Sequence, residues 1–451
     1  MDKFINPESV AVIGVSADPH RLGYSVFSNL KDSFSGRFYP VNPKYDRVDG
    51  LPCWPDLASL PETPDLAIVI VPAAAAPAVL EECGRKGITR VQIQSAGFSE
   101  VGPAGRAIQD RCDEVAARYG LRIWGPNCMG MVNGQTGLVA SFMRPDIWRD
   151  KLKPGNVSLI VQSGMLAAGF LMQVLSDGYF GLRVACSIGN RAGVTECDLL
   201  EYLVDDPLTE AVGLYLESVA DVPRFREAVS RLGRPVVLLK GGTSAEGAKA
   251  ARSHTASLAG NAELAEGFFR QLGLIRAHDF VEMMDLLKAL VLWRGRKGGR
   301  RIAIITGSGA AGIVASDHLS RQGMTLADLS PATVEALKTV YPPWMGPENP
   351  LDLFPALGHS GPITVYQTVF KALLEDPGVD GIFMQTFVDA RIVKHARKFM
   401  DILQNSSKPV VIWPMGDAAW FKPFRDEVEG LGLPAYPEIS RCISALRLMV
   451  G

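Results

Sequence analysis

His254 is the residue in this sequence whose surroundings best suit chemistry. It lies in a stretch of mostly small residues that runs from Lys240 to Gly260, directly after the apolar run 235–239. That run predicts a buried parallel strand, and ligands of open α/β sheets gather at the carboxyl ends of such strands. Small residues let a loop approach a ligand closely and change position. We therefore expect a reactive histidine here, with a structural or surface histidine as the alternative.

Two other predicted strands of the same module end in residues that suit phosphate chemistry. Ser163 and Gly164 follow the strand predicted at 157–161 and open a helix, whose unpaired backbone N–H groups attract an anion such as phosphate. Asn190 lies in a small polar loop after the next strand. A serine that only caps the helix is the alternative for Ser163.

Glu217 ends the third strand of this module. Its carboxylate would hold one ring nitrogen of His254 and leave the other nitrogen free to attack phosphorus. A surface glutamate is the alternative interpretation.

Near the N-terminus, a strand predicted at 9–14 leads into a turn and a helix, an arrangement typical of nucleotide sites. Lys44 follows the second strand, where an NAD-binding domain would have a carboxylate. A lysine suits a phosphorylated ribose better, and both NADP and coenzyme A (CoA) carry one. An ordinary structural turn remains the alternative. Residues 95–100 and 125–130 form two more small-residue loops after strands of this module, so we expect a cleft at this edge of the sheet.

The segment from Gly307 to Gly312 matches the GxGxxG pattern after a predicted strand, with Asp328 somewhat early for a ribose carboxylate. A lone match is weak, because glycines also serve tight turns and close packing. We do not expect a dinucleotide site there.

Composition excludes several classes of protein. The chain has 451 residues and a net charge of −2, so it lacks the basic character of nucleic-acid binders. The start carries no secretory signal pattern, and no apolar run reaches the roughly 20 residues that span a bilayer. The seven cysteines show neither CxxC spacing nor grouping with histidines, so we expect no metal site and a reducing, cytoplasmic setting.

Apolar strand patterns alternate with helical ones in three successive series, which predicts an α/β protein with parallel sheets. The strands of the first series are expected at 9–14, 38–41, 66–71, 90–94 and 122–124, those of the second at 157–161, 182–187, 211–217 and 235–239, and those of the third at 302–306, 381–386 and 409–413. A proline- and charge-rich linker at 151–155 and a basic run at 294–301 separate the series. We expect three domains, 1–145, 146–295 and 296–451.

The order of these motifs resembles the α subunits of nucleoside-diphosphate-forming acyl-CoA synthetases, the superfamily of succinyl-CoA synthetase and the ADP-forming acetyl-CoA synthetases. The resemblance covers nearly the whole chain. It rests on Tyr39–Lys44, Ser95–Glu100, Gly125–Cys128, Gln162–Gly164, Asp198–Leu203, Ser253–Thr255 with Leu258–Gly260, and Asn349–Asp352.

The resemblance implies a Rossmann-like CoA-binding domain followed by two flavodoxin-like domains of the succinyl-CoA-synthetase type. The implied CoA site comprises Gly14, Ser16, Arg21, Gly23, Lys44, Pro72, Ser95, Gly97, Asn127 and Cys128.

The implied reaction joins a small carboxylic acid to CoA at the expense of ATP, through an acyl phosphate and a phosphorylated His254. Glu217 would orient the ring, and Ser163, Gly164 and Asn190 would bind the phosphate. ATP, ADP and Mg²⁺ would bind a β subunit with an ATP-grasp domain, in a hetero-oligomer.

Two alternatives stay open, a CoA-binding regulatory protein without catalysis and an NADP-dependent oxidoreductase. Two departures from the family pattern, Ala256 and Met165, leave the acid substrate open.

Overall fold

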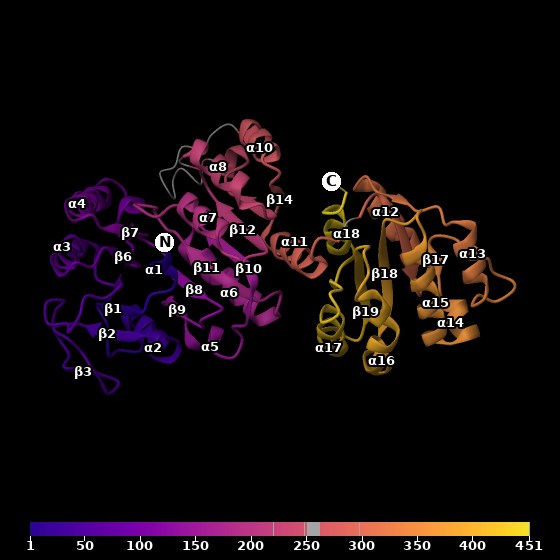
Figure 1. Cartoon of the computed structure of the whole chain (residues 1–451), viewed down its shortest axis with the longest axis horizontal. Helices are drawn as coiled ribbons and strands as arrows, with labels where there is room; N and C mark the ends of the chain where they lie inside the picture. The colour runs from indigo at the N-terminus through magenta and orange to yellow at the C-terminus, as the bar shows by residue number, and fades with distance from the viewer. Residues whose placement is uncertain (220, 248, 250–261, 297, 451) are drawn as a thin grey trace. The chain divides into compact units, whose positions relative to one another are not determined.

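The computed structural model describes residues 1–219, 221–247, 249, 262–296 and 298–450. The chain forms two compact units, Met1–Met283 and Met284–Gly451. Figure 1 colours the first from indigo to rose and the second from orange to yellow.

The first unit begins with a five-stranded parallel sheet. Its strand order is β2 (Arg37–Val41), β1 (Ser9–Ile13), β5 (Leu66–Val69), β6 (Arg90–Ile93) and β7 (Arg122–Trp124). The connecting helices are α2 (Leu22–Ser33), α3 (Ala76–Lys86) and α4 (Pro103–Tyr119), with the short segments α1 (Asp2–Ile5), β3 (Arg47–Val48), β4 (Leu51–Pro52), η1 (Ala73–Ala75) and η2 (Ser99–Val101) beside them. Strand β1 has β2 on one side and β5 on the other. The strand order therefore reverses direction at β1. The crevice that this reversal creates opens at the carboxyl end of β1, where the predicted nucleotide turn lies.

The second sheet of this unit has seven strands. Their order is β14 (Ile275–Ala277), β13 (Val236–Lys240), β12 (Ala211–Leu216), β10 (Pro154–Val161), β11 (Leu182–Ser187), β8 (Gly130–Asn133) and β9 (Val139–Ser141). The connecting helices are α5 (Pro145–Trp148), α6 (Gly164–Asp177), α7 (Glu196–Val204), α8 (Val222–Leu232) and α10 (Ala262–Gln271). Helix α11 (Phe280–Trp293) begins in the first unit and continues into the second, where Ala289 and Trp293 join a buried cluster.

Sequence patterns did not predict the β8–β9 hairpin. Strand β8 pairs antiparallel with both β11 and β9, so this sheet is mixed at one edge. The expected linker at 151–155 is also shorter than predicted, because β10 already begins at Pro154.

The second unit contains a parallel sheet with the order β16 (Thr325–Leu326), β15 (Arg301–Thr306), β18 (Gly381–Val388) and β19 (Val410–Gly416), and β17 (Leu351–Asp352) pairs with the end of β15. Its helices are α12 (Gly309–Arg321), α13 (Pro331–Lys338), α14 (Phe354–Ser360), α15 (Pro362–Glu375), α16 (Ala390–Met400), η3 (Asp401–Leu403), α17 (Ala418–Glu429) and α18 (Ile439–Arg447).

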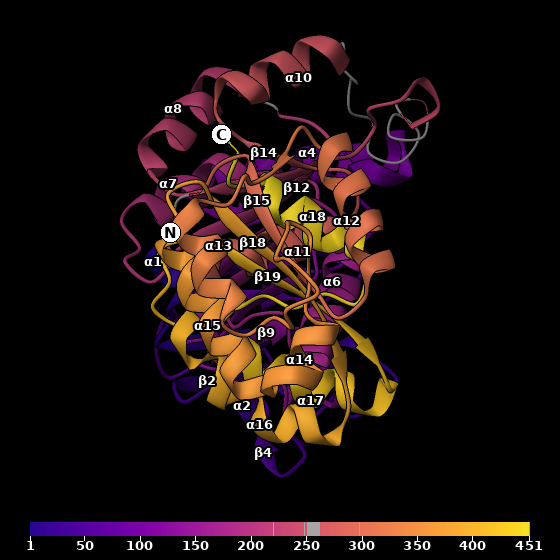
Figure 2. The same ribbon diagram turned by 90° about the vertical axis from the view of Figure 1, so that its right-hand side faces the viewer.

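Helices cover both faces of this sheet. Side chains of α12 and α18 share one buried cluster with the strands, and those of α13, α15, α16 and α17 share another. In Figure 2, α13, α14 and α15 lie in front of β18 and β19. Among the described residues, no helix has both the length and the apolar character that crossing a membrane requires.

Candidate active site

The turn after β1 brings two glycines into close contact. Gly14 has a φ of +93°, and its N–H donates to the carbonyl of Val41 (3.0 Å). A Cβ on Gly14 would overlap the carbonyl oxygen of Ile70, and a Cβ on Gly23 would overlap that of Gly14. Only glycine fits either position, so the first turn of α2 can pack directly on the loop. The amino end of α2 therefore lies at the predicted nucleotide turn.

Lys44 is held near this turn through Asn42. The side-chain amide of Asn42 donates to the carbonyl of Val15 (2.6 Å), and its oxygen accepts the N–H of Lys44 (2.9 Å). Both Lys44 and Arg21 are exposed, and Arg21 lies 3.6 Å from the carboxylate of Asp18. The structure thus places two exposed cations beside the turn, as an anionic ligand requires.

Ser16 lies in the same turn and is half-buried. Its hydroxyl accepts the N–H of Asp18 (3.0 Å). This hydrogen bond shapes the loop between β1 and α2.

The other predicted CoA loops adjoin one another at the same sheet edge. Asn127 donates its N–H to the carbonyl of Ser95 (2.9 Å). Gly97 lies against the loop that begins at Pro72, because a Cβ on Gly97 would come within 3.1 Å of the Ala73 side chain. Four of the predicted residues therefore lie on adjoining loops.

Cys128 differs from its neighbours because its side chain points into the protein. It is 1% exposed, and its thiol contacts the carbonyl of Ile93 (3.4 Å). Burial raises the pKa of this thiol to about 12, so the sulfur is protonated at neutral pH. The thiol therefore packs in the core.

Asn190 joins the two sheets of the first unit. Its amide nitrogen donates to Glu100 (2.6 Å) and Ser99 (3.2 Å), and its oxygen accepts from the amide of Asn127 (3.3 Å). Burial opposes ionisation of Glu100. The hydrogen bonds from Asn190 and from the N–H of Gly97 outweigh that effect and hold the pKa of Glu100 below its ordinary value. The predicted phosphate ligand Asn190 thus ties the loops at the carboxyl ends of the second sheet's strands to the predicted CoA loops.

The helix predicted to bind phosphate begins next to the same loops. Gly164 is the first residue of α6, and a Cβ on it would lie 3.4 Å from the carbonyl oxygen of Asn127 and 3.5 Å from the nitrogen of Met129. Gly189 is packed more tightly, with a φ of +55° and its Cα against the carbonyls of Pro126 and Asn127. The two predicted sites, for CoA and for phosphate, therefore adjoin.

Glu217 lies at the carboxyl end of β12 and is 7% exposed. Its N–H donates to the side-chain oxygen of Gln162 (2.8 Å), and its carbonyl accepts from the ammonium of Lys240 (2.7 Å). Its carboxylate accepts from the hydroxyl of Tyr215 (3.5 Å). Burial and, to a smaller extent, the charge of Glu217 raise the pKa of Tyr215 to about 12, which keeps the hydroxyl a donor at neutral pH.

The predicted partner of Glu217, His254, lies outside the described residues, as do Ser253, Thr255 and Ala256. The same holds for the side chain of Met165.

Sequence reasoning gave no role to Gln162, Lys240 or Arg191, although all three make hydrogen bonds to Glu217 or Ser218 at the carboxyl end of β12. Arg191 donates to the carbonyl (2.9 Å) and the hydroxyl (2.7 Å) of Ser218, next to Glu217. Burial, followed by repulsion from Arg276, lowers the pKa of Lys240. The sequence did contain a signal for Lys240, because a lysine at the end of an apolar strand needs a hydrogen-bond partner for its ammonium group.

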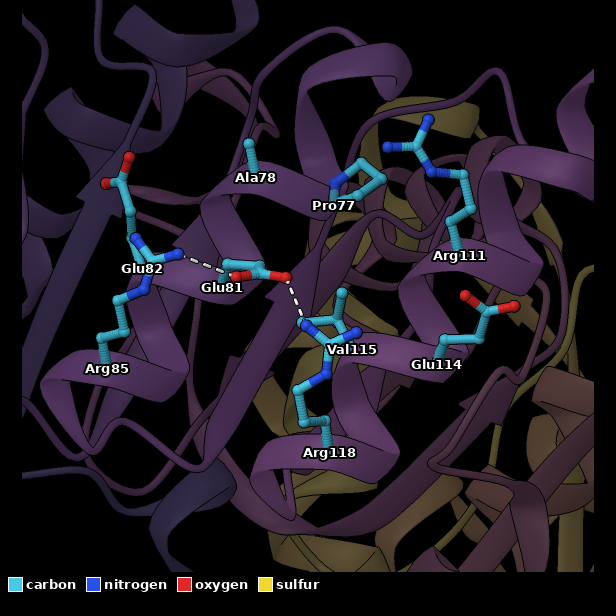
Figure 3. A pocket seen from close by; sticks show the side chains of 9 residues that line it. All are labelled: Pro77, Ala78, Glu81, Glu82, Arg85, Arg111, Glu114, Val115 and Arg118. Atoms are coloured by element: carbon cyan, nitrogen blue, oxygen red, sulfur yellow. Dashed lines mark hydrogen bonds and ion pairs between the residues drawn. The ribbon is translucent and has the colours of Figure 1, made fainter.

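A separate hollow of about 410 Å³ lies between α3 and α4 and is no part of this site. Figure 3 shows Glu81 accepting from both Arg85 (2.9 Å) and Arg118 (2.8 Å) across it. Three glutamates and three arginines line the hollow, so its charges balance. It runs along two helices rather than across strand ends, and we assign it no role in catalysis.

The glycine loop of the second unit does not form a dinucleotide site. Strand β16 pairs with the first residues of β15, whereas Gly307 follows the last, so Asp328 lies toward the other end of the sheet. Instead, the side-chain oxygen of Gln385 accepts the N–H of Gly307 and the hydroxyl of Thr306 (both 3.0 Å).

Comparisons with known proteins agree with this geometry. Three family models match in succession, a CoA binding domain at residues 8–134, a succinyl-CoA ligase like flavodoxin domain at 154–290 and a Ligase-CoA domain at 302–417. The α subunit of acetate–CoA ligase [ADP-forming] II from Pyrococcus furiosus is 36% identical over 97% of this chain and 94% of its own length. This chain belongs to the family of ADP-forming acyl-CoA ligase α subunits.

Other family members show the same relationship. The α subunit of acetate–CoA ligase [ADP-forming] I from Pyrococcus furiosus is 35% identical over 99% of this chain and 96% of its own length. Acetate–CoA ligase [ADP-forming] II of Archaeoglobus fulgidus is longer, and the match, at 33% identity, covers 98% of this chain and 65% of that protein. A solved structure of acetyl-coenzyme A synthetase 1 from Ca. Korarchaeum cryptofilum, in complex with phosphate and ADP, matches with a TM-score of 0.88 and 29% identity over 99% of this chain and 96% of that one.

These findings confirm the predicted family, its α/β fold with a CoA-binding domain and succinyl-CoA-ligase-type domains, and the ligase function. They favour the ligase over the regulatory protein and the oxidoreductase. The residues of the site and the boundaries at 145 and 295 stay predictions.

Proposed function

We propose that this chain supplies the CoA site and the phosphorylated histidine of an ADP-forming acyl-CoA ligase, and that a partner subunit with an ATP-grasp domain supplies the site for ATP and Mg²⁺. The observation that carries the proposal is the proximity of Gly164, at the amino end of α6, to Asn127 in the predicted CoA loop, since a Cβ on Gly164 would lie 3.4 Å from the Asn127 carbonyl oxygen. This proximity supports a single centre in which a phosphoryl group and the CoA thiol meet.

In the direction of acyl-CoA synthesis, the terminal phosphoryl group of ATP passes to a ring nitrogen of His254, and ADP leaves. A carboxylate oxygen of the acid then attacks that phosphorus, which breaks the P–N bond and forms an acyl phosphate. The CoA thiol, losing its proton, attacks the acyl carbon and expels inorganic phosphate. Glu217 stabilises the imidazolium form of His254 through its charge.

The proposed division of labour follows the three expected domains. Residues 1–145 would bind CoA, residues 146–295 would carry His254, and residues 296–451 would form a supporting third domain. Family members are named for different acids, acetate in Pyrococcus furiosus and 4-hydroxybutyrate in Nitrosopumilus maritimus. Family membership therefore leaves the acid used by this chain open.

Phosphorylation of His254 tests the proposal. The chain assembled with its partner, incubated with γ-labelled ATP and Mg²⁺, should acquire an acid-labile phosphate, and His254→Ala should acquire none. Mass spectrometry at neutral or alkaline pH should place the phosphate on the peptide that contains residue 254. Labelling of His254→Ala at the level of the unmodified protein would overturn the assignment.

A further inference from the structure

Arg191 has a backbone conformation that residues with a side chain rarely adopt. Its φ is +59°, in the left-handed region that favours glycine. Residues in such conformations cluster at functional sites, where the surrounding structure holds them. Here the neighbouring N–H groups do so. Asn190 donates to the carbonyl of Pro126 (2.9 Å). Ala192 donates to the carbonyl of Gly125 (2.9 Å). The backbone at Arg191 is therefore fixed to the predicted CoA loop.

The side chain of Arg191 extends from this segment to the end of β12. Its Nη1 donates to the carbonyl of Ser218 (2.9 Å), and its Nη2 donates to the Ser218 hydroxyl (2.7 Å). Two nitrogens of one planar guanidinium thus hold two groups of the same residue, which fixes direction as well as distance. Ser218 directly follows Glu217, so Arg191 connects the predicted CoA loop to the residue beside the proposed orienting carboxylate.

Glu196 provides the opposite charge for the guanidinium. This residue is fully buried at the start of α7, and its carboxylate lies 3.2 Å from Nη1 of Arg191, whose side chain is 13% exposed. Buried charges are costly unless they are paired. An ion pair that served only α7 would need the contact with Glu196 and not the two hydrogen bonds to Ser218.

Ser218 is also held from the amino end of α6. Its N–H donates to the side-chain oxygen of Gln162 (3.3 Å), which lies two residues before the start of that helix. Gln162 and Arg191 therefore fix one residue to the predicted phosphate-binding helix and to the predicted CoA loop. Such fixing matters, because a displacement of about 1 Å can lower a catalytic rate about 10²-fold.

We propose that Arg191 is a positioning residue of the ligase, which acts through Ser218 to hold the carboxylate of Glu217 in place relative to the predicted CoA loop. This inference rests on the proposed roles of Glu217 and His254. In this role Arg191 affects catalysis only through Glu217.

The rate of histidine phosphorylation tests this role, measured on the chain assembled with its partner and given γ-labelled ATP and Mg²⁺. Arg191→Lys keeps the charge beside Glu196 but loses the planar fork that holds Ser218. We expect the rate at saturating ATP to fall by about tenfold or more. The KM for ATP and the Kd for CoA should not change, because the proposed role involves neither ligand. Ser218→Ala, which removes only the hydroxyl, should also lower the rate.

Arg183→Lys is the matched control. Arg183 is a buried arginine whose Nε lies 3.1 Å from the carboxylate of Asp206. It lies near the amino end of β11, whereas Glu217 follows the carboxyl end of β12. Loss of a buried ion-pair geometry should lower the Tm of both variants. Only Arg191→Lys should lower the phosphorylation rate.

A double-mutant cycle with Glu217→Gln gives a measurement that a merely structural role would not change. A residue that acts through Glu217 loses its effect once that carboxylate is gone. We therefore expect the double variant to react within about twofold of the rate of Glu217→Gln alone, whereas independent effects would add.

Different failures have different meanings. An unchanged rate in Arg191→Lys, a full additional loss in the Glu217→Gln background, or equal slowing by Arg183→Lys would overturn the positioning role and leave the ligase function standing. No phosphohistidine in the unmodified assembled protein would overturn the proposed function, and the inference with it.

Discussion

Glu217, which we propose orients the ring of His254, has a backbone that is fixed on both sides. Gln162 accepts its N–H and Lys240 donates to its carbonyl, so the carboxylate projects from a rigid strand end. A carboxylate that orients a catalytic base works through both its position and its charge.

Glu217→Gln separates these two contributions. The amide keeps the shape of the side chain but removes the charge that supports an imidazolium, so we expect the rate of histidine phosphorylation to fall about 10²- to 10⁴-fold. Folding and CoA binding should persist. Rapid-quench labelling with γ-labelled ATP measures the rate. Glu227→Gln, the same change at an exposed position on α8, should leave it unaltered, and an unchanged rate in Glu217→Gln would assign the orienting role to another residue.

Lys44→Glu tests the CoA site. The new carboxylate would repel the phosphates of CoA beside the Gly14 turn, so calorimetric titration should show CoA affinity lowered at least tenfold. Lys371→Glu makes the same change of charge on α15 and should bind CoA normally. Equal binding by Lys44→Glu would remove this lysine from the site, and a preference of the unmodified chain for NADP over CoA would argue against the CoA assignment itself.

At the scale of elements, the strands of the parallel sheets could be predicted because each is a short apolar run that ends in small or polar residues. Strands β7 and β11 have the predicted bounds, and β1 differs by one residue. The β8–β9 hairpin could not be predicted, because its place in the second sheet depends on pairing with β11, about 50 residues away. Sequence also located the loops of Cys128 and Asn190 but not the directions of their side chains, which packing between the two sheets decides.

Gly189 is the element-scale test of that packing. A Cβ there would overlap the carbonyl of Pro126, and its φ of +55° disfavours side chains. Gly189→Ala should therefore cost on the order of 1–3 kcal/mol in strain, with the overlap adding to it. Gly164→Ala is the control, because its added methyl would make only ordinary contacts, at 3.4 Å and beyond. Thermal unfolding of the assembled protein should show a lower Tm for Gly189→Ala and little change for Gly164→Ala. The same Tm for both variants would contradict the tight contact between the CoA loop and the second sheet.

At the scale of the whole molecule, the three large sheets and the helices that connect their strands account for most of the described chain. The first adjoins the second through Asn190 and Gly189, and the third lies in a compact unit of its own. Phosphoryl transfer from ATP needs a cradle for the triphosphate and carboxylates that hold Mg²⁺, because its catalysis depends mainly on positioning and charge neutralisation. The sequence has no GxxxxGK[ST] loop, and the glycine segment from Gly307 to Gly312 lacks the lysine that would make it one.

We therefore expect the chain to depend on a partner for ATP. Purified without a partner and given CoA, Mg²⁺, ATP and a panel of carboxylic acids, it should form no acyl-CoA and no phosphohistidine, while still binding CoA in a calorimetric titration. Adding a subunit with an ATP-grasp domain should restore both products, since His254 would then meet a bound triphosphate. CoA binding is the control that separates a missing partner from a misfolded chain. Robust acyl-CoA formation by the partner-free chain would place the ATP site within these 451 residues and contradict the proposed division of labour.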